Sequence, residues 1–98
     1  MDPIKEEFRK LKKLDQEYVQ ICAQIEKEQE ELEYLFANYE VVFNKYVFDK
    51  IGTFYEVQAA KDAYEEKSRE LWNLHYDQRL IIRDRELLKT RLQGNLTG

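Results

Sequence analysis

The residue types that most often carry chemistry in proteins are scarce in this chain. Its 98 residues include one histidine, His75, and one cysteine, Cys22. A zinc or di-iron site needs several histidine, cysteine or carboxylate ligands, and the Glu-x-x-His motif of di-iron bundles is absent. The sequence also lacks a glycine-rich phosphate loop and a nucleophile elbow. We therefore expect no metal, no cofactor and no enzymatic activity.

Cys22 lies on an apolar stripe and has no lysine, arginine or histidine close to it in the sequence. A neighbouring cation is what usually lowers a thiol pKa and makes the sulfur reactive. We expect an inert, buried thiol. A single cysteine also rules out a disulfide within the chain.

Three polar residues, Glu28, His75 and Gln78, interrupt otherwise apolar positions. If the chain folds back on itself near residue 52, Glu28 faces His75 and Gln78 across the seam. Such a polar layer typically fixes the register of paired helices. A Glu28–His75 pair would also make association pH dependent, because histidine titrates near neutrality.

Helices must position these residues, because the apolar residues of the first half follow heptad spacing. Counting from Ile4, all seven a positions are apolar or aromatic: Ile4, Leu11, Tyr18, Ile25, Leu32, Tyr39 and Tyr46. This spacing predicts an amphipathic helix and excludes strand alternation. Asp2 is a favourable N-cap, and Pro3 suits the first helical position. We expect the first helix to span residues 3–50.

The strongest break in the pattern lies around Gly52. Glycine readily adopts the left-handed conformation that ends a helix, and Thr53 with Glu56 forms a capping box that begins another. We expect a turn at 51–53 and a second helix over 54–93, with Gly94 ending it. The predicted fold is all-α, a single domain of two long helices forming an antiparallel helical hairpin. One continuous helix through Gly52 is the alternative.

The second helix carries two apolar stripes. The inward stripe comprises Val57, Ala60, Tyr64, Leu71, Leu74, Ile81, Leu88 and Leu92, with polar interruptions at Lys67, Gln78 and Arg85. The other stripe lies on nearly the opposite side of the helix. An exposed apolar stripe usually marks an interface, although long charged neighbours can also cover one. The predicted partner-binding residues are Trp72, Tyr76, Leu80 and Leu87, flanked by Arg79, Arg83 and Asp84.

Charge is segregated along a chain whose net charge is −4. Residues 15–33 are acidic, whereas basic residues gather near both ends of the sequence. One interpretation is that the basic residues dock an acidic partner. The other is that they form an ordinary solvated helix surface with local ion pairs. The pattern argues against nucleic acid, because no aromatic residues interleave the basic groups. No apolar run is long enough to span a membrane.

The pattern as a whole resembles the WXG superfamily of type VII secretion: an acidic helical hairpin of about a hundred residues with a glycine-containing turn. It is most similar to the small helical accessory proteins encoded beside LXG toxins. The turn Ile51-Gly52-Thr53 lacks the Trp-x-Gly of the superfamily. The family's export signal is an aromatic residue followed four positions later by an acidic residue. The segment from Leu80 to Asp84 keeps the acid and the spacing but has leucine in place of the aromatic residue. The segment from Phe36 to Glu40 matches the signal, but it lies on the first predicted helix.

The resemblance implies a non-enzymatic adaptor or chaperone that packs against the helical domain of a toxin. We expect a cytoplasmic protein without a Sec signal, exported, if at all, together with its partner. Two alternatives remain open. One is a self-associating coiled-coil protein such as a phage scaffold or tether, and the other is a type III or flagellar export chaperone.

Overall fold

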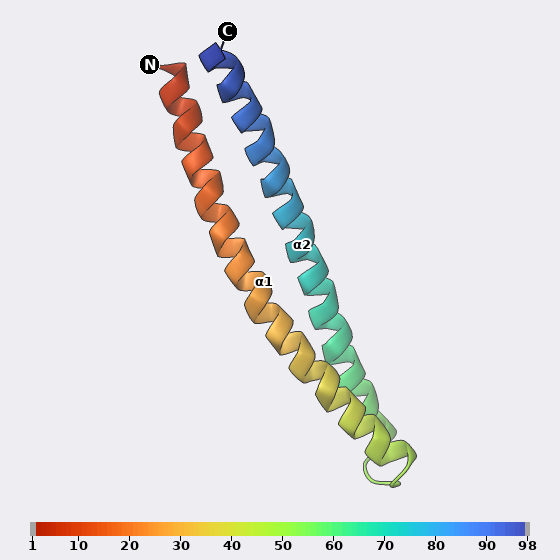
Figure 1. Cartoon of the computed structure of the whole chain (residues 1–98). Helices are drawn as coiled ribbons and strands as arrows, with labels where there is room; N and C mark the ends of the chain where they lie inside the picture. The colour runs from red at the N-terminus through yellow and green to blue at the C-terminus, as the bar shows by residue number, and fades with distance from the viewer. Residues whose placement is uncertain (1, 98) are drawn as a thin grey trace. The chain divides into compact units, whose positions relative to one another are not determined.

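The protein consists of two long α-helices, α1 (Pro3–Val47) and α2 (Phe54–Thr97) (Figure 1). The computed structural model describes residues 2–97, and no strand occurs within that range. The helices pack against each other as a helical hairpin, which confirms the predicted fold class. The alternative of one continuous helix through Gly52 is wrong, because residues 48–53 are not helical.

The start of α1 follows from its first residues. The Ile4 N–H donates to Asp2 Oδ1 at 3.0 Å, and the Glu6 N–H donates to the Asp2 carbonyl at 3.3 Å. Asp2 is therefore the N-cap, and it satisfies donors that the helix itself leaves without partners. Pro3 occupies the first helical position, as the sequence predicts.

The end of α1 lies three residues before the predicted one. The Phe48 N–H still bonds to the Asn44 carbonyl at 2.9 Å, but Lys50 then adopts a φ of 57°. A left-handed lysine is uncommon, so the sequence offers no signal for this early break. The turn accordingly spans residues 48–53, and the Ile51 N–H satisfies the Lys45 carbonyl at 2.9 Å.

The start of α2 is capped by Thr53. Its Oγ1 accepts the Glu56 N–H at 3.2 Å, and its carbonyl accepts the Val57 N–H at 3.3 Å. Gly52 has a φ of 94°, and a Cβ built there would lie 2.8 Å from Glu56 Oε2. The positive φ favours glycine at this position, whereas the Glu56 carboxylate is the flexible end of a side chain and could move aside.

The end of α2 differs from the prediction, because the helix continues through Gly94 to Thr97. Among the described glycines, Gly52 alone has a positive φ. A helical glycine costs about 1 kcal/mol relative to alanine, which is too little to end a long helix by itself. Gly94 therefore does not act as a C-cap.

The chain divides into two compact units, which we call the turn unit and the terminal unit. The turn unit is Ile25–Asn73, and the terminal unit comprises the residues up to Gln24 and those from Leu74 onward. Val57 and Leu71 are buried in the turn unit, and Ile21, Leu88 and Leu92 in the terminal unit. All four buried residues of α2 belong to the predicted inward stripe.

Neither unit has a deep core. No described side chain is fully buried, because two helices side by side leave each residue one face toward solvent. Aromatic contacts supplement the core of the turn unit. The ring of Tyr64 lies 5.2 Å from that of Phe36 and is stacked on Tyr39 at 6.4 Å, measured between centroids.

Candidate partner-binding surfaces

Lys67 is the centre of a polar cluster in the turn unit. Its Nζ donates to Glu28 Oε2 at 2.6 Å and to Glu31 Oε2 at 2.8 Å, and it lies 3.2 Å from Glu70 Oε2. The side chains of Lys67 and Glu28 are each 17% exposed. One ammonium group thus serves two carboxylates from α1 and one from its own helix.

These hydrogen bonds shift the pKa values of the cluster. The bonds to Glu28 and then Glu31 raise the pKa of Lys67 above its ordinary value. The bond from Lys67 lowers the pKa of Glu31. Each group therefore stabilises the charged form of the other, and both are ionised at neutral pH.

Glu28 has a different partner from the one predicted. It pairs with Lys67 rather than with His75, which lies two helical turns further along α2 and is exposed. A lysine has a long, flexible stem, so its ammonium reaches Glu28 and Glu31 together, which a short imidazole side chain cannot do. The sequence placed Lys67 on the inward stripe but did not reveal that it would hold Glu28.

A second polar cluster lies in the terminal unit. Arg85 Nε donates to Asp15 Oδ1 at 2.7 Å, and its guanidinium carbon lies 4.5 Å from the centroid of the Tyr18 ring. Gln78 Nε2 donates to Cys22 Sγ at 3.3 Å. A hydrogen bond with Cys22 raises the pKa of Tyr18, and the charge of Arg85 opposes this effect. Cys22 is half-buried, not fully buried as predicted.

All three polar interruptions of the inward stripe therefore have a partner on α1. Lys67 binds Glu28, Gln78 binds Cys22, and Arg85 binds Asp15. No buried side-chain nitrogen or oxygen among the described residues lacks a hydrogen bond. These contacts join the helices within each unit.

The predicted partner-binding residues lie on α2 and are mostly exposed. In the terminal unit, Tyr76 is 52% exposed and Leu87 56%, whereas Leu80 is half-buried. Trp72, which belongs to the turn unit, is 66% exposed.

The charged residues predicted to flank this face are also on the surface. Arg79, Arg83 and Asp84 are exposed, and Arg83 Nη2 lies 3.5 Å from Asp84 Oδ1. In the terminal unit, this face thus combines apolar side chains with charged side chains at its edge. Its role in binding stays a prediction.

A surface that sequence analysis missed lies at the turn. Four large apolar or aromatic side chains, which we call the aromatic tip, are 58–83% exposed: Phe48, Ile51, Phe54 and Tyr55. They are adjacent to a hollow lined by Tyr46, Val47, Lys50 and Gly52. The sequence signal that could have revealed this surface is the group of apolar residues on both sides of Gly52. At a turn, no facing helix covers such side chains.

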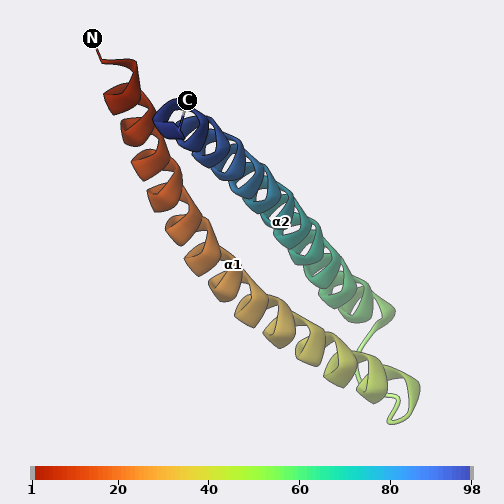
Figure 2. The same cartoon turned by 45° about the horizontal axis from the view of Figure 1, so that its top comes forward.

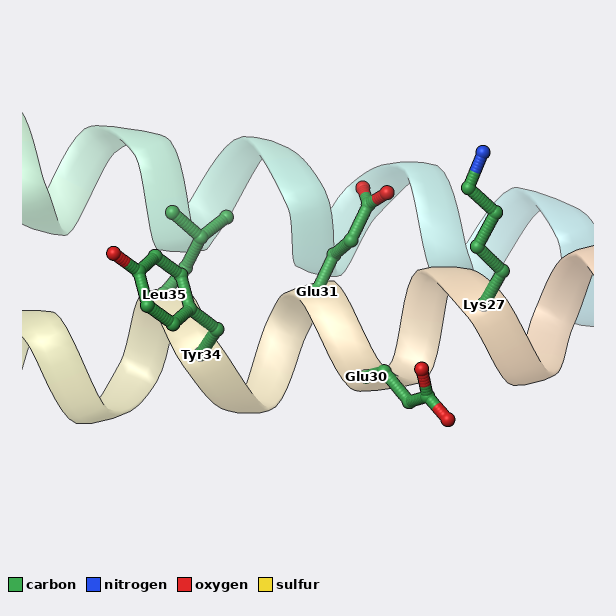
Figure 3. Close-up of a pocket in the computed structure, with 5 residues that line it drawn as sticks. All are labelled: Lys27, Glu30, Glu31, Tyr34 and Leu35. Atoms are coloured by element: carbon green, nitrogen blue, oxygen red, sulfur yellow. The ribbon is translucent and has the colours of Figure 1, made fainter.

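Two open grooves run along α1, one in each unit. The first is lined by Lys27, Glu30, Glu31, Tyr34 and Leu35, and the second by Lys12, Asp15, Gln16, Val19 and Gln20. In the close-up of the first groove, Glu31 and Leu35 extend toward α2, whereas Glu30 points away (Figure 3). Each groove follows a single helical face, a geometry that suits a partner helix better than a small molecule.

The charge of the two units is opposite in sign. The turn unit has twelve acidic and six basic residues, and the terminal unit has ten basic and eight acidic residues. Within residues 2–97, no three histidine, cysteine or carboxylate side chains gather as a metal site would require. No helix in that range is long and apolar enough to cross a membrane.

Comparison with protein-family models, with curated proteins and with solved structures gave no match to this chain. Function is therefore inferred from the residues and their geometry.

Proposed function

We propose that this protein is a non-enzymatic helical adaptor that packs side by side with helices of a partner protein. One observation supports this most directly. Among the described residues, sixteen large hydrophobic side chains are exposed and five are buried. Burying a large apolar side chain stabilises by roughly 1.5–3 kcal/mol, so a third helical layer would add substantially to the stability of the fold.

The positions of the exposed residues favour a helical partner. Tyr76, Leu80 and Leu87 follow one face of α2, and Val19 and Tyr34 line grooves on α1. Helical partners recognise such faces through side chains spaced three, four and seven residues apart. Arg79 and Arg83 at the edge favour an acidic partner and act mainly on association rate.

The resemblance to LXG-toxin accessory proteins indicates what the partner is. In this proposal the client is the long helical N-terminal domain of a type VII toxin, and the complex assembles in the cytoplasm before export. The antiparallel hairpin with a glycine at its turn supports the comparison. Because the chain departs from the Trp-x-Gly turn and from the export signal, the role that we propose is to bind the client and not to direct its export.

The test compares two double variants of the full chain, each co-expressed with the candidate toxin domain. Tyr76→Ala with Leu87→Asp alters the face of the terminal unit, where both side chains are exposed and their loss should leave the hairpin folded. Tyr55→Ala with Val41→Asp is the matched control, because these exposed residues lie elsewhere. We expect the first variant to lose co-purification and the control to retain it, with the same far-ultraviolet helical signal in both.

Solution mass of the chain expressed alone distinguishes the self-association alternative. An adaptor should form no defined homo-oligomer. A discrete homo-oligomer that Tyr76→Ala with Leu87→Asp dissolves would make the same face a self-association surface and would overturn the adaptor proposal. Unchanged binding to the client in that variant would show that the face has no role in it.

A further inference from the structure

The aromatic tip is unlike the other exposed apolar surfaces of the protein, because Phe48 and Ile51 lie in the turn and Phe54 and Tyr55 in the first turn of α2 that follows it. Phe48 is 74% exposed and Tyr55 83%, with Ile51 and Phe54 close to 60%. Figures 1 and 2 show the turn that joins α1 to α2 and closes the turn unit at one end. A third helix packed along α1 or α2 would have no helix to pack against at Phe48 and Ile51, which lie in the turn.

Two lysines accompany the apolar residues of the tip. Lys45 is in the last turn of α1, and Lys50 is in the connecting turn, where it also lines the hollow. Both side chains are exposed, and neither makes an ion pair or side-chain hydrogen bond within the described part of the chain. Long lysine stems keep the ammonium near water or phosphate while lying against apolar surroundings.

We propose that the aromatic tip inserts into the interface of a phospholipid bilayer. Phe48, Ile51 and Phe54 contact the outer part of the acyl chains, and Lys45 and Lys50 bind lipid phosphates. Exposed apolar side chains and lysines without an ion pair among the described residues thus stand next to each other in this turn, as an interface of acyl chains and phosphates requires. Tyr55 has the apolar ring and polar hydroxyl that favour this interface.

The backbone of the tip limits the depth of insertion. Residues 48–53 are not helical, so part of their N–H and C=O groups depends on water for hydrogen bonds. Such a backbone is not tolerated in the hydrocarbon interior, but it is at the headgroup boundary. The tip is therefore an interfacial anchor and not a spanning segment.

Charge indicates which lipids it binds. Lys45 and Lys50 balance Asp49 and Glu56 around the tip, whereas the turn unit as a whole has twice as many acidic as basic residues. Anionic lipids would repel this unit. Zwitterionic lipids offer the same phosphates without that repulsion, so binding should be strongest there and nearly independent of salt.

The experiment measures flotation of the full chain with vesicles of phosphatidylcholine. Phe48→Ser with Ile51→Ser removes the apolar side chains of the turn, and each change should weaken binding by at least about tenfold, because each removes a large buried apolar group. Val19→Ser with Tyr34→Ser is the matched control, since these residues are 67% and 73% exposed and lie outside the tip. The control should float like the unmodified protein.

Tryptophan emission locates the contact. In a Phe54→Trp, Trp72→Phe variant, the emission maximum should shift to the blue when vesicles are added, whereas the native Trp72 should respond little. Absence of flotation by the unmodified protein, or equal flotation of the tip variant, would overturn the proposal. So would loss of the toxin-domain complex in the tip variant without any vesicle binding, which would make the tip a protein-docking surface.

The result is independent of the proposed adaptor function. Tyr76→Ala with Leu87→Asp leaves the tip intact and should float normally even where it no longer binds the client. Failure of one proposal is thereby distinguished from failure of the other.

Discussion

Lys67 shows how one residue can determine the pairing of two helices. Its ammonium is held by Glu28, Glu31 and Glu70, and the side chains of Lys67 and Glu28 are largely shielded from water. A shielded pair of this kind contributes little net stability but penalises every arrangement that separates the partners. The cluster therefore acts mainly on register.

Removing one partner should be more harmful than removing both. We expect Lys67→Met to lower the midpoint of thermal unfolding, because Glu28 and Glu31 then lose the cation that they share. Lys67→Met with Glu28→Leu should restore the midpoint or raise it, as measured by circular dichroism. Lys61→Met is the control, since the Lys61–Glu65 pair is exposed and 3.8 Å long and should matter little. A double variant no more stable than Lys67→Met would contradict this account.

The same cluster predicts how stability depends on pH. The folded pKa of Glu31 is lowered from an ordinary value of 4.5, so its contribution is present above pH 4.5 and is lost as the pH falls through the lowered pKa. The pKa of Lys67 is raised from 10.5, so its contribution is complete below pH 10.5 and is lost at higher pH. Urea unfolding at several pH values should show Glu31→Gln less stable than the unmodified protein at pH 7. The difference should vanish in acid, and a constant difference would exclude the Glu31–Lys67 interaction as its cause.

At the scale of the elements, helix ends depend on local signals of unequal strength. Asp2 and Thr53 each cap a helix through a side-chain oxygen, and Gly52 adopts the left-handed conformation that only glycine adopts easily. Gly94 lacks any such constraint. A Cβ placed there would meet nothing within 4 Å, and its φ is not positive.

The two glycines should therefore respond in opposite directions to the same substitution. Gly94→Ala should stabilise the protein by up to about 1 kcal/mol, because alanine favours a helix that passes through this position. Gly52→Ala should destabilise it by about 1–2 kcal/mol, owing to the positive φ of this residue. Urea unfolding measures both. A destabilising Gly94→Ala would mean that α2 ends at this glycine after all.

At the scale of the whole molecule, the small number of buried residues makes the stability of the hairpin depend on whether a partner is bound. No described side chain is fully buried, so much of the apolar surface that a third layer would cover is exposed in the chain by itself. A partner that binds only the folded hairpin must stabilise it by mass action. The proposed client should therefore raise the unfolding temperature in a concentration-dependent way.

This effect has a definite expected size. At a free client concentration one hundred times Kd, the stabilisation should be about 2.7 kcal/mol. Calorimetry of the chain with and without the toxin domain measures it, and Tyr76→Ala with Leu87→Asp should abolish the shift while Tyr55→Ala with Val41→Asp preserves it. An equal shift in both variants would remove the terminal-unit face from the binding surface.

The sequence by itself determined the two helices, their reversal near Gly52 and the residues of the inward stripe. These depend on heptad spacing and on caps, which act between residues close together in the chain. The buried residues Val57, Leu71, Leu88 and Leu92 all lie at positions that the spacing predicted.

Only the tertiary structure decided which residues meet across the seam and which remain exposed. Glu28 pairs with Lys67 and not with the predicted His75, because the axial offset of two helices depends on packing along their whole length. The left-handed Lys50 placed the turn earlier than Gly52 indicated. Phe48 and Tyr55 remain exposed at that turn. An apolar residue in a sequence indicates a preference for burial, but only the tertiary structure shows whether another element is present to bury it.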